Sequence, residues 1–444
     1  MKTIVTKFGG SSLASTEQFR KVAAIIQADP NRRVVVASAP GKRSGADVKV
    51  TDLLYRCYEQ AVSGGDYRPV LEQIRLRFAE IISGLGVSFD LDRELAVIDQ
   101  HLQQNPEREY MASRGEYLNA GILAAFLGWT FCDTAVLVRF SAEGVFDAEQ
   151  TQTLLSGALQ RTERAVLPGF YGASEDGTIH TFSRGGSDVT GALAARAAQA
   201  ELYENWTDVS GMLAADPRIV ENPRAIDYIS YQELRELSYM GASVLHEDAV
   251  FPVRKAGIPI NIRNTNRPED PGTMIVAVLP ESRRPRIITG IAGRTGFSSI
   301  QVEKPMMNAE IGFGAKLLQI LASYGVPFEH CPTGIDTMSV LVNKEHLQPV
   351  RTQVLAEIQE KLQPEILTVE DNLALIAVVG QGMASARGTA ARIFGKLADN
   401  GVNIRMIDQG SSELNIIIGV DEADYQMAVC SCYAAGVDDN QQNC

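Results

Sequence analysis

Two glycine pairs constrain the fold of this chain most strongly, because each pair separates an expected strand from an expected helix. The sequence K-F-G-G-S-S at residues 7–12 follows an apolar strand predicted at 3–6. The sequence F-S-R-G-G-S-D-V-T at 182–190 precedes an alanine-rich helix predicted at 191–200. Glycine loops flanked by hydroxyl side chains and a charge can wrap their backbone N–H groups around a phosphate. Two such loops indicate one site that holds a polyphosphate and a second, acidic substrate.

The N-terminal part alternates short apolar runs with helical stretches, which is typical of an α/β fold with a mainly parallel sheet. The run V-V-V-A at 34–37 fits a strand buried on both faces. A turn at 175–178 predicts a hairpin that leads directly into the second glycine loop. Residues 52–110 are charged and amphipathic, which predicts a helical excursion from the sheet. The predicted strands are 3–6, 33–38, 130–133, 179–182, 200–207 and 259–262.

A linker is predicted at residues 279–286, L-P-E-S-R-R-P-R, where two prolines and several charges interrupt the pattern. Beyond it, helical segments at 315–322 and 390–398 are each followed by a glycine that would cap the helix and lead into a strand. A strand-like run precedes each helix and a hairpin-like region follows it. The chain is therefore predicted to form three domains, at 1–280, 287–366 and 367–444, of which the last two are repeated modules.

Composition limits the classes of partner. The 444 residues carry a net charge of −13 without a basic cluster, which argues against nucleic acid as a partner. No apolar run reaches the roughly 18 residues of a membrane span. The six cysteines form no C-x-x-C pair and show no zinc-like histidine spacing, as in reduced cytosolic proteins. Since no apolar leader precedes the first predicted strand, we expect a cytoplasmic protein.

Lys7 stands directly before the first glycine pair. A phosphate can approach the glycine backbone there, and a lysine ammonium can bridge the leaving and transferred oxygens in phosphoryl transfer. The alternative is a tight strand-to-helix turn with an exposed lysine. In the second loop, Arg184 offers a fork for a carboxylate, and Asp188 could either organise the reacting groups or only cap its helix.

Two further polar clusters adjoin expected element ends. Glu116, in S-R-G-E at 113–116, is expected to open a helix at 117–127, where it could accept from an ammonium group or only balance the helix dipole. Thr207 and Asp208, with Asp216 and Arg218 downstream, follow a predicted strand. Nucleotides bind at such strand ends in open α/β sheets, and a polar turn is the alternative.

These motifs, in this order, resemble those of the aspartate kinase family over nearly the whole chain. They are K-F-G-G-S-S at 7–12, V-V-V-A-S-A-P at 34–40, V-T-D-L-L at 50–54, S-R-G-E at 113–116, S-R-G-G-S-D at 183–188, T-D-V-S-G at 207–211, A-D-P-R at 215–218, I-S-Y-Q-E-L-R-E-L at 229–237, G-A-S-V-L-H at 241–246 and I-R-N-T-N-R-P-E-D-P-G-T at 262–273. The resemblance implies a three-layer sandwich of the amino-acid-kinase type followed by two ferredoxin-like βαββαβ ACT modules. In the family the first module is inserted into the second, so residues 287–292 could supply a strand to the second.

The resemblance also implies an activity. Members phosphorylate the side-chain carboxylate of L-aspartate with ATP to give 4-phospho-L-aspartate, the first step of lysine, threonine and methionine biosynthesis. Mg²⁺ would bridge the phosphates of ATP, largely through water and phosphate oxygens, with no residue assigned as a metal ligand. ACT modules bind end-product amino acids, so lysine, threonine or both are expected to inhibit. Pairing of the modules would give a homodimer or a dimer of dimers, and a monofunctional enzyme is expected.

Family roles fall on matching positions of this sequence. Lys7 and Asp188 match the catalytic residues, while Glu116 would hold the α-ammonium of aspartate and Arg184 a carboxylate. The aspartate-site positions are Ser38, Thr51, Glu116, Phe170, Arg184 and Ser187. The ATP-site positions are Lys7, Gly9, Gly10, Ser11, Thr207, Asp208, Leu213, Asp216, Arg218 and Ser243. The effector-site positions are Met307, Gly312, Phe313, Glu329, Thr333, Gly334, Ile335 and Asp336.

Three positions in two motifs depart from the family pattern. Leu213 replaces a tyrosine, which removes an aromatic ring that could stack on adenine or ribose. Ser243 and Glu247 replace a lysine and a proline, so that a cation on the phosphate side is missing and weaker ATP binding is expected. Two other functions stay open: an enzyme of the same fold that acts on glutamate, acetylglutamate or carbamate, and a catalytically weak amino-acid sensor that uses only its ACT modules.

Overall fold

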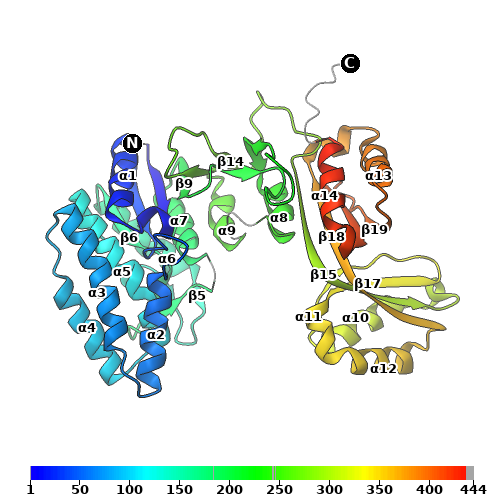
Figure 1. Cartoon of the computed structure of the whole chain (residues 1–444), viewed down its shortest axis with the longest axis horizontal. Coiled ribbons are helices and arrows are strands. Elements are labelled where there is room, and N and C mark those ends of the chain that lie inside the picture. The colour runs from blue at the N-terminus through cyan, green and yellow to red at the C-terminus, as the bar shows by residue number, and fades with distance from the viewer. Residues whose placement is uncertain (1, 184, 243–244, 246, 437–444) are drawn as a thin grey trace. The chain divides into compact units, whose positions relative to one another are not determined.

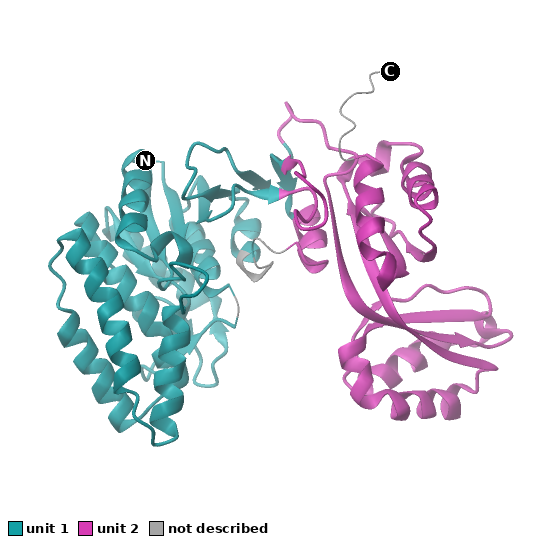
Figure 2. Ribbon diagram, viewed as in Figure 1, with its two compact units in different colours: residues 1–212, 226–231, 244–279 teal, residues 213–225, 232–243, 280–444 magenta. Residues whose placement is uncertain are grey.

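The computed structural model describes residues 2–183, 185–242, 245 and 247–436 (Figure 1). The chain divides into two compact units (Figure 2). The first contains residues 1–212, 226–231 and 244–279, and the second contains residues 213–225, 232–243 and 280–444. The boundary at residue 280 adjoins the predicted linker, whereas nothing in the sequence pattern signals that 213–225 and 232–243 belong to the second unit.

An eight-stranded, mainly parallel sheet forms the centre of the first unit, as predicted. Its strand order is β12-β14-β13-β9-β1-β2-β6-β3. Strand β1 runs parallel to both β2 and β9, while β13 and β14 are antiparallel. The valines at 34–36 are buried, as expected for a strand covered on both faces. The strands are β1 (Ile4–Phe8), β2 (Arg32–Ala37), β3 (Thr130–Phe131), β6 (Ala165–Pro168), β9 (Leu202–Thr207), β12 (Tyr228–Ser230), β13 (Ile260–Asn264) and β14 (Thr273–Val276).

The strand predicted at 179–182 does not join this sheet. It forms β8 (Ile179–Thr181), which pairs with β7 (Tyr171–Ala173) in the predicted hairpin. That hairpin belongs to a separate sheet of order β5-β4-β7-β8, with β4 (Arg139–Phe140) and β5 (Phe146–Asp147). The hairpin leads to the second glycine loop, as expected.

Helices surround the main sheet, and the predicted helical excursion is confirmed. Helices α2 to α4 and the start of α5 fill residues 52–110 and pack on one another around a core that includes Leu54, Ile74 and Phe78. The helices of this unit are α1 (Thr16–Gln27), α2 (Val50–Val62), α3 (Arg68–Leu85), α4 (Leu91–Gln104), α5 (Arg108–Leu127), α6 (Ala148–Arg161), α7 (Gly186–Ala197) and α9 (Glu247–Ala256).

The second unit is built on a six-stranded antiparallel sheet of order β16-β17-β15-β18-β20-β19. Two long strands, β15 (Gly290–Glu303) and β18 (Ile366–Val379), run through both halves of it. The remaining strands are β16 (Phe328–His330), β17 (Thr337–Asn343), β19 (Ile404–Asp408) and β20 (Asn415–Asp421). The helices are α8 (Tyr231–Tyr239), α10 (Phe313–Ser323), α11 (Lys344–Leu347), α12 (Arg351–Leu362), α13 (Thr389–Asp399) and α14 (Tyr425–Ala434). A short ribbon, β10 (Met212–Leu213) and β11 (Ala225–Ile226), lies where the chain passes between the units.

The first half, β15-α10-β16-β17-α12-β18, has the βαββαβ order that the resemblance implied, whereas the second half runs β18-α13-β19-β20-α14 and takes its remaining strand from earlier in the chain. Residues 290–294 of β15 pair with residues 375–379 of β18, in the half that also contains β19 and β20. The first part of β15 therefore completes the second module. Both repeated helices end as predicted, because Gly325 and Gly401 adopt φ angles of 68° and 72° that favour glycine.

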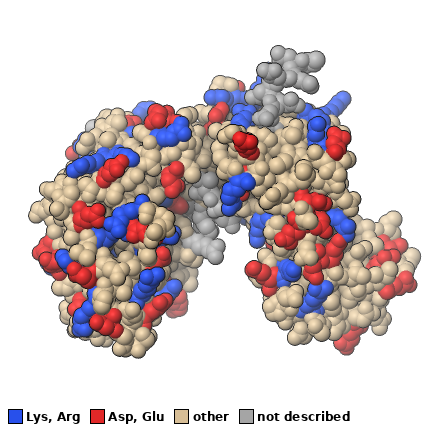
Figure 3. Space-filling view, viewed as in Figure 1, with Lys and Arg blue, Asp and Glu red and all other residues tan. Residues whose placement is uncertain are grey.

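Charges are mixed on the surface. On the face shown in Figure 3, acidic and basic side chains are interspersed. Within the part of the chain that the structure describes, no helix is both long and apolar enough to cross a membrane.

Candidate active site

A lysine–aspartate pair lies where β1 and α7 meet. Lys7 is only 8% exposed, and its Nζ lies 2.6 Å from Asp188 Oδ1. Asn205, the neighbour of Lys7 across β1 and β9, donates from Nδ2 to the same carboxylate oxygen at 2.9 Å. The Tyr203 hydroxyl donates to the Asp188 carbonyl at 3.1 Å. These contacts hold the ammonium and carboxylate groups in fixed positions, so the exposed-lysine alternative is wrong.

Asn205 was not among the site residues predicted from the sequence. Its only signal is that Tyr203, Asn205 and Thr207 alternate along β9 and therefore share one face of the strand. A prediction that gave this face to Thr207 could have included Asn205 as well.

The first glycine loop continues from β1 into a single 3-10 turn, Gly10–Leu13. The Gly9 N–H donates to the Trp206 carbonyl of β9 at 2.9 Å. At Gly10 a Cβ atom would lie 2.9 Å from the Ala39 carbonyl oxygen and 3.1 Å from the Gly41 nitrogen. Glycine is needed here because two backbone segments approach closely. The loop thus presents backbone beside Lys7, as a phosphate cradle requires.

The helix after the second glycine loop begins earlier than predicted. Helix α7 starts at Gly186 rather than at residue 191, so Ser187 and Asp188 lie in its first turn. Gly185 precedes the helix with a φ of 57°, and Gly186 packs closely on Phe170, where a Cβ would lie 2.5 Å from the ring. Asp188 is therefore close to the positive end of a helix, where a carboxylate is favoured. Arg184 lies outside the described residues.

Phe170 adopts a backbone conformation that only a few non-glycine residues tolerate, with φ at +80°. Two hydrogen bonds hold it there: its N–H donates to Thr190 Oγ1 at 3.0 Å, and its carbonyl accepts the Phe182 N–H at 3.0 Å. Gly169 packs against Ser187, where a Cβ would come within 2.5 Å of Oγ. These contacts bring Phe170 and Ser187 close to Asp188. Strained backbone of this kind clusters at functional sites.

Glu116 lies within α5 and not at a helix start, which corrects the predicted helix at 117–127. Only 6% of the residue is exposed. Burial raises the pKa of its carboxyl to about 8, although a hydrogen bond from the Ala39 N–H favours the charged form. Its Oε2 has no hydrogen-bond partner among the residues that the structure describes. A buried carboxylate oxygen without a partner is costly, so this atom is suited to a cationic ligand.

Ser38 and Thr51 flank the loop after β2. The Ser38 N–H donates to the Phe8 carbonyl at 3.2 Å, which joins the ends of β2 and β1, and its own carbonyl accepts from Asn119 Nδ2 at 2.7 Å. Thr51 lies in the first turn of α2 and is half-buried. The carboxyl ends of parallel strands are where ligands bind in open α/β sheets.

The predicted nucleotide residues divide between the two units. Thr207 is the last residue of β9 and Asp208 follows it in the first unit, with Thr207 Oγ1 donating to Asp208 Oδ1 at 3.2 Å. In the second unit, Arg218 donates from Nε and Nη2 to the two carboxylate oxygens of Asp216, and this hydrogen bonding holds the pKa of Asp216 below its usual range. Leu213 is 38% exposed. Ser243 lies outside the described residues.

The predicted effector residues surround the loops of the first module. Met307 and Phe313 are buried in its core, so only their backbone groups are available to a ligand. Asp336 accepts the Met306 N–H at 2.8 Å. Ile335 is 71% exposed. The other members stand nearby in the chain: Gly312 precedes α10, Thr333 and Gly334 precede β17, and Glu329 lies in β16.

Comparison with known proteins decides the family. A model of the amino acid kinase family matches residues 2–264, and an ACT domain model matches residues 376–435. Aspartokinase 3 of Bacillus subtilis is 40% identical to this chain over 97% of both sequences. The chain belongs to the aspartokinases of the amino acid kinase family.

Solved aspartokinases share the fold over nearly the full length. The aspartate kinase of Clostridium acetobutylicum, described as an allosteric enzyme, is 47% identical with a TM-score of 0.88, covering 98% of this chain and 100% of that one. E. coli aspartokinase III in complex with aspartate and ADP is 26% identical with a TM-score of 0.74, covering 98% and 99%. The same protein with lysine and aspartate has a TM-score of 0.73 at 25% identity, covering 99% and 100%. The predicted family and fold class are confirmed.

Proposed function

We propose that this aspartokinase transfers the γ-phosphate of ATP to the side-chain carboxylate of L-aspartate, giving 4-phospho-L-aspartate and ADP. The buried pair of Lys7 and Asp188, held between a glycine loop and a helix N-terminus, is the observation that carries the proposal. The complex of E. coli aspartokinase III with aspartate and ADP supports the choice of substrates.

The chemistry needs charge stabilisation more than proton transfer. The aspartate side chain ionises near pH 4 and is already a carboxylate at neutral pH, so no general base has to activate it. One of its oxygens attacks the γ-phosphorus while the bond from that phosphorus to the bridging oxygen of ADP breaks. The Lys7 ammonium would balance the charge on the oxygens in transfer. Asp188 and Asn205 keep that ammonium in place.

The nucleotide would lie along the first glycine loop, with backbone groups of Gly9, Gly10 and Ser11 beside its phosphates. Mg²⁺ would supply further neutralisation of the phosphate oxygens. Asp188 and Asp208 provide hard oxygen donors of the type Mg²⁺ takes, directly or through water. The assignments of Thr207, Leu213, Asp216, Arg218 and Ser243 to the ATP site stay predictions.

On the aspartate side, Glu116 would accept the α-ammonium through its unpaired Oε2. An ammonium there would satisfy the buried oxygen and favour its charged form. Arg184 would pair with a carboxylate of the substrate. Ser38, Thr51, Phe170 and Ser187 complete the proposed pocket.

Regulation is proposed through the second unit. Lysine, threonine or both would bind the loops of the first ACT module, and the complex of E. coli aspartokinase III with lysine supports this. The proposed division of the chain is 1–280 for catalysis, with ACT modules at 287–366 and 367–444. We further propose a homodimer or a dimer of dimers that acts in the cytoplasm.

A substrate panel tests the proposal. ADP release and hydroxamate formation would be measured with L-aspartate, L-glutamate, N-acetylglutamate and carbamate, each with ATP and Mg²⁺. The proposal predicts that aspartate gives the highest kcat/KM and an aspartyl hydroxamate. Preference for another acceptor would move the chain to a different reaction of the same fold, and binding of lysine or threonine without any turnover would make it a sensor.

A further inference from the structure

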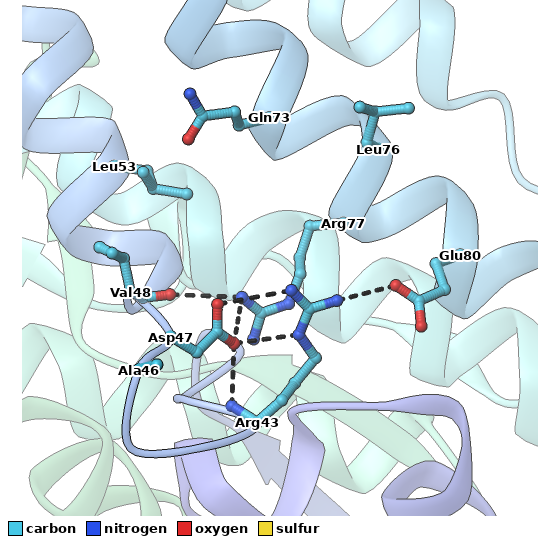
Figure 4. Close-up of a pocket in the computed structure, with 9 residues that line it drawn as sticks. All are labelled: Arg43, Ala46, Asp47, Val48, Leu53, Gln73, Leu76, Arg77 and Glu80. Carbon is cyan, nitrogen blue, oxygen red and sulfur yellow. Dashed lines mark hydrogen bonds and ion pairs between the residues drawn. The ribbon is translucent and has the colours of Figure 1, made fainter.

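Arg77 is a buried arginine on a helix that supplies none of the proposed substrate contacts. It lies in α3, and only 5% of it is exposed. Its Nη2 donates to the Gly41 carbonyl at 2.6 Å, and its Nη1 donates to the Val48 carbonyl at 3.2 Å. The same Nη1 lies 2.8 Å from Asp47 Oδ2 (Figure 4). One guanidinium thus holds both ends of the loop at 41–48.

A second arginine fixes the carboxylate in this cluster. Arg43 donates to Asp47 from its backbone N–H at 2.9 Å and from Nε at 3.0 Å, and its Nη1 reaches Glu80 Oε2 at 2.8 Å. The hydrogen bond from the Arg43 side chain keeps the pKa of Asp47 well below its usual range. Asp47 therefore stays charged and remains a partner for the buried Arg77.

Side-chain packing between the loop and α3 is incomplete beside this cluster. A cavity of about 290 Å³ lies there, lined by Leu53, Gln73 and Leu76 together with the charged residues (Figure 4). Close packing normally fixes a loop against a helix. Here the contacts made by Arg77 and Asp47 have to supply that restraint.

The loop held by Arg77 touches the phosphate cradle directly. The Gly41 N–H donates to the Gly10 carbonyl at 2.8 Å. A Cβ at Gly41 would lie 2.7 Å from the Gly10 carbonyl carbon and 2.8 Å from the Ser11 nitrogen. No side chain separates the two backbones, so a shift of Gly41 would move Gly10 and Ser11.

The same segment also reaches the proposed aspartate pocket. The Ala39 N–H donates to Glu116, and a Cβ at Gly115 would come within 2.7 Å of the Ala39 side chain. The Pro40 carbonyl accepts the Val50 N–H at 3.2 Å, one residue before Thr51. Residues 39–41 therefore lie between the two sides of the proposed site.

We infer that Arg77 is a positioning residue for phosphoryl transfer: by holding the carbonyls of Gly41 and Val48 and the carboxylate of Asp47, it sets the cradle at Gly10 and Ser11. The kinetic consequence of this inference rests on the proposed function, whereas its structural consequence is independent of that function. Small displacements of reacting groups are expensive, since about 1 Å can cost 100-fold in rate.

The test compares Arg77→Met and Arg77→Lys with Arg75→Met. Arg75 is the matched control, because it lies on the same helix but pairs with Glu72 at the surface. Arg77→Met is expected to lower kcat/KM about 10- to 100-fold for both substrates. Arg77→Lys should recover part of this loss, since an ammonium can keep the Asp47 pair but not both carbonyls. The kcat/KM of Arg75→Met should equal that of the wild type.

Amide hydrogen exchange gives a readout that does not depend on catalysis. Arg77→Met should speed exchange in peptides covering residues 39–50 and 7–13, whereas faster exchange confined to α3 would overturn the inference. Asp47→Asn gives the same test if Arg77→Met does not fold. A folded Arg77→Met with wild-type kcat and KM would reduce Arg77 to a structural residue. If the wild type does not phosphorylate aspartate but Arg77→Met still speeds exchange at residues 7–13 and 39–50, the proposed function is contradicted and the structural role of Arg77 is not.

Discussion

Lys7 Nζ and Asp188 Oδ1 lie 2.6 Å apart although the two residues are far apart in the sequence. The pair exists because β1 and β9 are neighbours in the sheet and because α7 begins early enough to place Asp188 in its first turn. Both glycine loops therefore meet at one pair of charges. This meeting point explains why a single site can hold a nucleotide phosphate and an acidic acceptor.

Glu116 gives a prediction about pH. Its carboxyl has a pKa of about 8 because burial disfavours the charged form. Only the ionised form can pair with the α-ammonium of aspartate, so kcat/KM for aspartate should rise from about pH 7 to about pH 9. Glu116→Gln should lower kcat/KM and flatten this rise. Initial rates at low aspartate across this range measure it, and a rise that survives in Glu116→Gln would assign the ionisation to another group.

Ionisation of the Glu116 carboxyl, which favours aspartate binding, lowers the stability of the protein. An ordinary glutamate ionises near pH 4.3 in an unfolded chain. A folded-state pKa raised above that value contributes stability that is present at pH 4 and is lost as the pH rises through about 8. Denaturant unfolding should therefore show that Glu116→Gln becomes more stable relative to the wild type as pH increases. A constant difference between the two would contradict the buried, protonated carboxyl.

The positions of several strands and the two glycine loops could be predicted because their signals are local. Apolar runs such as 34–37 report burial directly, and Gly9 and Gly10 mark a close approach of backbones. The start of α7 was predicted too late, and the close packing of Phe170 on Gly186 at that point has no local signal in the sequence. The S-R-G-E motif was predicted to open a helix, but Gly115 lies inside α5, where a Cβ would come within 2.7 Å of the Ala39 side chain.

Other residues of the site give no sequence signal by themselves. Asn205 and Arg77 are single polar residues within ordinary strand and helix patterns. Only the tertiary structure shows that one contacts Asp188 and that the other holds Gly41 and Val48. Lone polar residues of this kind are more often solvent-exposed, so sequence patterns alone favour the wrong interpretation.

Glu204 gives a prediction about stability. Its buried carboxylate accepts from Arg32 Nε at 2.8 Å and Nη2 at 3.0 Å, and also from Trp206 Nε1 at 2.9 Å. Removing one partner of a buried pair leaves the other charge uncompensated, so Glu204→Gln should lower the free energy of unfolding by about 3–5 kcal/mol. Glu72→Gln, which breaks the exposed pair with Arg75, should cost much less, because solvent screens that pair. Equal costs in denaturant titration would contradict the buried network.

Helix α8 gives a prediction about feedback. Three residues spaced along it contact other segments of the second unit. Glu233 accepts from Thr289 at 2.6 Å, Glu236 accepts from Asn415 at 2.6 Å, and the Tyr239 hydroxyl donates to Glu329. Glu329 is a predicted effector residue, and the segment at 241–246 follows α8 directly. Tyr239→Phe should raise the half-inhibitory concentration of the effective amino acid about 3- to 10-fold while leaving kcat unchanged.

The matched control for Tyr239 is Tyr324→Phe. Tyr324 also donates to a glutamate of the first module, Glu357, at 2.8 Å, but from a helix that does not lead to the proposed ATP site. Its removal should leave inhibition by lysine and threonine unchanged. If both variants shift inhibition equally, the effect is a general weakening of the module and not a property of α8.

Single-turnover transfer from γ-labelled ATP to L-aspartate tests the central claim most directly. The wild type should form aspartyl phosphate. Lys7→Met and Asp188→Asn should each slow the step about 100- to 1,000-fold, and the double variant should be little slower than either, because the two residues act as one unit. No aspartyl phosphate from the wild type, or fully additive losses in the double variant, would contradict the assignment of this pair to phosphoryl transfer.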